Sequence, residues 1–71
     1  MFKIAVIDGQ GGGIGSTIIK KIKAQFGESV EIVALGTNAI ATAQMLKARA
    51  NRGASGENAI VQTVARVDVV V

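Results

Sequence analysis

A glycine-rich run near the N-terminus constrains the fold more than any other feature of this sequence. Five of the seven residues at positions 9–15 are glycine, and they follow a nearly continuous apolar segment, KIAVID, at residues 3–8. Such a short apolar run is typical of a strand that is buried on both faces of a parallel sheet. The glycines are too flexible for a regular element, so we expect a tight loop that leads into a helix.

The rest of the chain repeats this alternation of short apolar runs and longer segments of helical period. Apolar side chains at every fourth position from 14 to 26 predict an amphipathic helix, beginning at residue 14 or 16 and ending at Gly27. The run EIVAL at 31–35 predicts a second strand. A second helix is expected to reach Ala50, with Gly53 as its stop. Residues 57–65 favour a third helix, although their β-branched side chains also permit a strand, and residues 67–71 predict the last strand.

This order of elements predicts an α/β fold, because parallel neighbouring strands need a long crossover connection. We expect one Rossmann-like domain over residues 1–71, with a parallel three-stranded sheet and crossover helices, β-α-β-α-(α)-β. Strand orders 3-2-1 and 2-1-3 both fit. Because the apolar last strand would leave an unpaired edge, we expect an incomplete doubly wound domain, truncated after the third strand, or a homo-oligomer.

Composition excludes several classes of protein. The chain of 71 residues has no Cys and no His, and its 49% of hydrophobic residues are too many for intrinsic disorder. Its apolar runs are far shorter than a membrane-spanning helix. The N-terminus lacks the long apolar region of a secretory signal, which indicates a cytoplasmic protein. Phe2 and Phe26 are the only aromatic residues of the sequence, so we expect no nucleic-acid partner.

The glycine loop predicts an anion site, because a glycine-rich turn before a helix exposes backbone N–H groups and the positive end of the helix dipole. Asp8 either accepts N–H groups of the loop and fixes the turn, which we favour, or binds a metal. Thr37 and Asn38 follow the second strand, where they could line the ligand crevice or cap the next helix. The candidate binding residues are Asp8, Gly9, Gln10, Gly11, Gly12, Gly13, Ile14, Gly15, Thr37 and Asn38.

The loop resembles that of the short-chain dehydrogenases and reductases. Gly9, Gly13 and Gly15 fit G-x-x-x-G-x-G. The resemblance implies NAD(P) or another nucleotide as ligand: Gly9 would make the turn, Gly13 would admit the diphosphate and Gly15 would pack the helix against the strand. Asp8 stands where those enzymes usually carry Thr, and the chain has no Tyr to support hydride transfer. Whether the protein is an enzyme therefore stays undecided.

Two alternatives remain open. The opening residues also look like the deviant Walker loop of division-site and partition ATPases. Gly11 and Ser16 stand at the positions of that family's lysines, and Thr17 matches its Mg²⁺-binding hydroxyl. This alternative is a degenerate P-loop-like binder in which Asp8 and Thr17 share Mg²⁺ with a nucleotide. In the other, the protein has a structural or assembly role and the loop is only a packing turn.

Over its whole length, the chain resembles a small bacterial family of uncharacterised proteins, a numbered domain of unknown function. The resemblance rests on KIAVIDGQGGGIG at 3–15, ALGTNA at 34–39 and GENAIV at 56–61. It implies a Rossmann-like fold and a place in the N-terminal part of a longer chain. It implies no activity, since none is assigned to the family.

Overall fold

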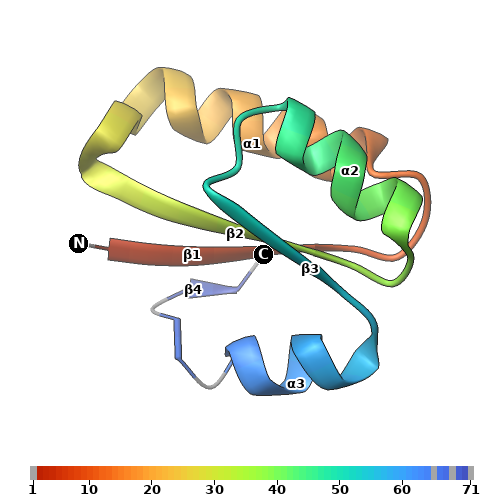
Figure 1. Ribbon diagram of the computed structural model, residues 1–71. Coiled ribbons are helices and arrows are strands. Elements are labelled where there is room, and N and C mark those ends of the chain that lie inside the picture. The colour runs from red at the N-terminus through yellow and green to blue at the C-terminus, as the bar shows by residue number, and fades with distance from the viewer. Residues whose placement is uncertain (1, 65, 68, 71) are drawn as a thin grey trace.

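Strands and helices alternate along the chain in the computed structural model, which describes residues 2–64, 66–67 and 69–70 (Figure 1). All the strand pairs are parallel, and the four-stranded sheet has the order β3-β2-β1-β4. The predicted α/β class with a parallel sheet is thereby confirmed. The elements are β1 (Phe2–Asp8), α1 (Gly13–Phe26), the 3₁₀ turn η1 (Gly27–Ser29), β2 (Val30–Gly36), α2 (Ala39–Lys47), β3 (Arg52–Ser55), α3 (Glu57–Val64) and β4 (Val69–Val70).

Strand β3 is an element that the sequence pattern does not predict. Gly53, expected as the stop of the second helix, lies within this strand, and α2 ends at Lys47 rather than at Ala50. The residue just before β3 already contacts β2, because Oδ1 of Asn51 accepts a hydrogen bond from the Ile32 amide at 2.8 Å. The strand expected as the third is therefore the fourth, and its predicted positions 68 and 71 lie outside the described residues.

Helices cover both faces of the sheet. Figure 1 shows α1 and α2 on one face and α3 on the opposite face. The core between the sheet and the first two helices includes Ile19 and Met45, both fully buried. Ala5 and Leu35 are also fully buried. Because neighbouring strand residues point to opposite faces, burial of both sets explains why β1 and β2 read as continuous apolar runs.

The two edges of β1 are paired to different extents. Along one edge, β2 pairs with all of β1, from Phe2 opposite Val30 to Asp8 opposite Gly36. On the other edge, the described pairs with β4 involve only Ile4 and Ala5. The order 3-2-1-4 is that of the first four strands in dinucleotide-binding doubly wound sheets, whose ligands bind beyond the carboxyl ends of the strands where the winding reverses. In this protein that point lies between β1 and β4.

Candidate functional site

The glycine loop turns sharply from β1 into α1. The helix begins at Gly13, slightly earlier than predicted, and Gly12 precedes it with a φ of 82° in the left-handed region. A Cβ atom on Gly12 would lie 2.5 Å from the carbonyl oxygen of Ala41 and 2.8 Å from Cβ of Gln44. Glycine is therefore required at position 12 both for the backbone conformation and for the close approach of the loop to α2.

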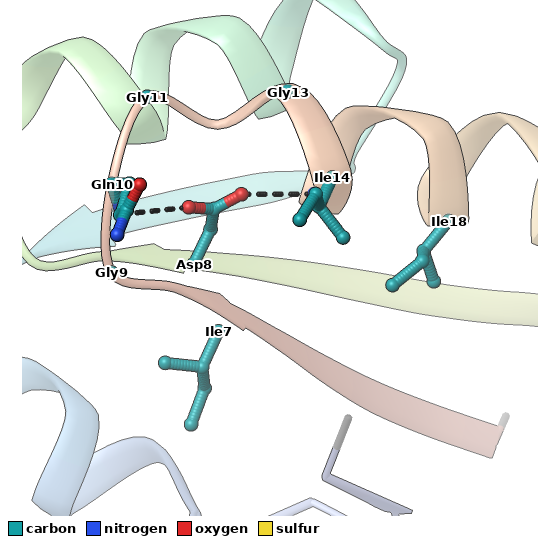
Figure 2. Close-up of a pocket in the computed structure, with 9 residues that line it drawn as sticks. Ile7, Asp8, Gly9, Gln10, Gly11, Gly13, Ile14 and Ile18 are labelled. Carbon is teal, nitrogen blue, oxygen red and sulfur yellow. Dashed lines mark hydrogen bonds between the residues drawn. The ribbon is translucent and has the colours of Figure 1, made fainter.

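The Asp8 carboxylate lies inside the loop. Its Oδ1 accepts the Gln10 amide at 2.8 Å and its Oδ2 accepts the Gly15 amide at 2.9 Å (Figure 2). These backbone hydrogen bonds, chiefly those from Gln10 and Gly15, lower the pKa of Asp8, and burial opposes them. Asp8 is thus held ionised and fixes the turn, which confirms the favoured interpretation of this residue. Two of the amides expected to meet an anion are occupied by the protein's own carboxylate.

The first two amides of α1, unlike those of Gln10 and Gly15, do not donate to the Asp8 carboxylate. Among the described residues, no acceptor bonds to the amide of Gly13 or of Ile14. A Cβ atom on Gly13 would meet no atom within 4 Å. A Cβ atom on Gly15 would instead lie 2.6 Å from Sδ of Met45 and 3.1 Å from Oδ2 of Asp8. The loop therefore separates a packing glycine, Gly15, from a position that is open to solvent, Gly13.

Thr37 and Asn38 hold the loop in place from the side of β2. The Thr37 hydroxyl donates to the Gly9 carbonyl at 2.9 Å, and Nδ2 of Asn38 donates to the Gln10 carbonyl at 3.1 Å. Oδ1 of Asn38 also accepts the Ala41 amide at 2.9 Å, so the predicted helix cap is confirmed for this residue. Both side chains thus connect the loops that follow β1 and β2.

A hollow of about 520 Å³ lies at the carboxyl end of β1. It brings together most of the predicted site residues and two isoleucines that the sequence analysis did not include. Figure 2 shows Ile7 pointing away from α1, whereas Ile14 and Ile18 extend from that helix. The four-residue spacing of Ile14 and Ile18 was a signal for a shared helix face. The lining residues are Ile7, Asp8, Gly9, Gln10, Gly11, Gly13, Ile14, Gly15 and Ile18.

The predicted pair for Mg²⁺, Asp8 and Thr17, is engaged in local hydrogen bonds. The Thr17 hydroxyl donates to the Gly13 carbonyl at 3.1 Å, one helical turn earlier. Within the part of the chain that the structure describes, no cluster of three or more His, Cys, Asp and Glu residues is arranged to hold a metal ion. In the same residues, no helix combines the length and hydropathy needed to cross a membrane.

A family profile described as a domain of unknown function (DUF3842) matches residues 3–71. The chain belongs to the DUF3842 family. This match confirms the expected membership in an uncharacterised family. Apart from Phe2, the matched residues include the glycine loop and all the strands of the sheet described above. No curated protein and no solved structure matches the chain significantly.

Proposed function

We propose that this DUF3842 protein binds the phosphate group of a nucleotide, NAD(P) or another, in the hollow at the carboxyl end of β1. The observation that carries the proposal is the coincidence of the hollow with the point where the winding of the sheet reverses. Open parallel sheets place their ligands in this crevice. The lining combines apolar side chains with backbone polar groups, as small-molecule sites do.

The phosphate would be held by the start of α1. The Gly13 and Ile14 amides belong to the first turn of that helix, where the positive end of the dipole favours an anion. Open space around Gly13 supports this placement, because phosphate oxygens must come close to the backbone. Asp8 opposes it in part, since an ionised carboxylate nearby repels phosphate. We therefore expect modest affinity, improved by a cation that accompanies the nucleotide.

Isothermal titration calorimetry of the protein with NAD, NADP, ATP, AMP and inorganic phosphate tests the proposal. Gly13→Val should abolish the binding of any nucleotide that binds the unaltered protein, because a branched side chain would fill the space in front of the amides. Ala39→Val is the matched control, since Ala39 is the exposed first residue of α2. It should leave binding unchanged.

Absence of binding for all five ligands would contradict the proposal, as would equal binding by the protein and Gly13→Val. In either case the structural alternative would account for the loop. The specific observation in its favour is that the Asp8 carboxylate already binds the amides of Gln10 and Gly15.

A further inference from the structure

We infer that the ligand of this site is a mononucleotide, one phosphate-bearing nucleoside unit, rather than a dinucleotide that extends along the sheet edge toward β2. This inference rests on the proposed function and specifies its substrate class. Four features of the described residues carry it: the position of the hollow, the bridge between the two loops, the residues at the end of β2, and the apolar wall.

The hollow lies on the side of β1 that faces away from β2. Its lining includes Ile7, which points away from α1, and Ile14 and Ile18, which belong to α1, so it reaches both faces of the sheet. The edge shared with β2 is paired as far as Asp8 and Gly36. Among the described residues, its lining includes none of β2 or of the loop after β2, so the hollow lies at the end of β1, beyond the described pairs of β4 with Ile4 and Ala5.

The crevice toward β2 is closed by hydrogen bonds. Thr37 donates through its hydroxyl to Gly9 and through its amide to the Asp8 carbonyl, at 2.9 and 3.2 Å, and Asn38 donates to Gln10. These contacts join the two loops across the path that the second half of a dinucleotide would take. Bonds from a ligand to these groups would first have to replace bonds within the protein.

The end of β2 also lacks the group that reads the ribose of a dinucleotide. That group is an Asp or Glu for NAD and an Arg for NADP. Here β2 ends at Gly36, which is buried, and a Cβ atom at this position would collide with the hydroxyl oxygen of Thr42. The next residues, Thr37 and Asn38, are neutral and already bonded to the glycine loop.

The wall of the hollow suits a single planar base. Ile14 is 77% exposed although it is a large apolar residue, and Ile7 and Ile18 are half-buried beside it. When a ring system covers apolar surface that is exposed around a hollow, it removes that surface from water and so stabilises the complex. A base packed on these isoleucines would leave its phosphate near the amides of Gly13 and Ile14.

Calorimetric titration of the protein with AMP, NMN and NAD tests the inference. If only one nucleoside unit is held, NAD should bind no more than about threefold tighter than the better mononucleotide. Ile14→Ser should weaken that mononucleotide about tenfold, because the base loses its apolar contact. Ile40→Ser is the matched control: Ile40 is the second residue of α2, as Ile14 is of α1, and it is 71% exposed. The affinity of Ile40→Ser for the mononucleotide should stay within about twofold of that of the unaltered protein.

The outcomes separate this inference from the proposed function. Binding of NAD at least about tenfold tighter than of AMP and NMN would overturn the mononucleotide assignment and leave nucleotide binding standing. Equal effects of Ile14→Ser and Ile40→Ser would overturn the placement of the base on Ile14, and with it the assignment. No binding of any of the three would overturn both.

Discussion

Arg49 has the most unusual backbone conformation among the described residues other than glycine, with a φ of 84°. It follows the last turn of α2, where its amide bonds to the Leu46 carbonyl and the Ala50 amide bonds to the Met45 carbonyl. This pair of bonds is the Schellman arrangement, in which the left-handed position is usually glycine. At this residue an arginine side chain therefore carries a conformational cost.

Replacing Arg49 by glycine should relieve that cost. We expect Arg49→Gly to raise the free energy of unfolding by about 1 kcal/mol, measured by urea denaturation. Arg49→Ala is the control, because it removes the same charge from a surface that also holds Lys20, Lys23 and Glu28 but keeps the unfavourable φ. An equal gain in both variants would show that removal of the charged side chain, and not relief of the backbone, is the cause.

Asp8 should make stability depend on pH in the acid range. Its pKa is lower in the folded protein because the amides of Gln10 and Gly15 stabilise the carboxylate. The stabilisation is therefore present above the ordinary carboxyl pKa of about 3.9 and is lost as the pH falls through the lower folded value. Below about pH 4, the unfolding free energy should fall more steeply for the protein than for Asp8→Asn. Parallel curves for the two proteins would refute the role given to this carboxylate.

At the scale of elements, the glycine loop that leads into α1 packs closely against α2. Gly12 has a positive φ and faces the Ala41 carbonyl oxygen, whereas Gly13 faces open space. Gly12→Ala should lower the free energy of unfolding by at least about 1 kcal/mol, while Gly13→Ala should change it by less than about 0.5 kcal/mol. Thermal and urea unfolding of the two variants measures the difference. Equally small changes in both variants would mean that neither the positive φ nor the contact with α2 requires glycine at position 12.

β1 and β2 could be predicted from the sequence because burial on both faces leaves continuous apolar runs, and α1 because its apolar residues recur with helical period. β1, α1 and β2 follow the predicted segments closely. β3 could not be predicted, because RGAS is mostly exposed at the sheet edge and has no apolar pattern. The end of α2 at Lys47 could not be predicted either, because the residue with left-handed backbone that follows the helix is Arg49 and not a glycine.

At the scale of the whole molecule, the candidate site depends on contacts between segments that are distant in sequence. The turn-fixing role of Asp8 could be predicted, because a carboxylate directly before a glycine run has loop amides within reach. The bonds of Thr37 and Asn38 to the loop carbonyls could not, since they follow from the pairing of β1 with β2. The strand order could not be chosen from the sequence, because 3-2-1 and 2-1-3 both fit the three predicted strands; the structure places those three in the order 2-1-3.

The most direct test of the account is a ¹H–¹⁵N NMR titration of the protein with AMP. Binding at the start of α1 predicts saturable shifts of the Gly13 and Ile14 amide resonances. It predicts smaller shifts for the Gln10 and Gly15 amides, because these already donate to Asp8. Resonances of the loop that do not move at saturating AMP, or shifts confined to residues outside the hollow, would contradict the account.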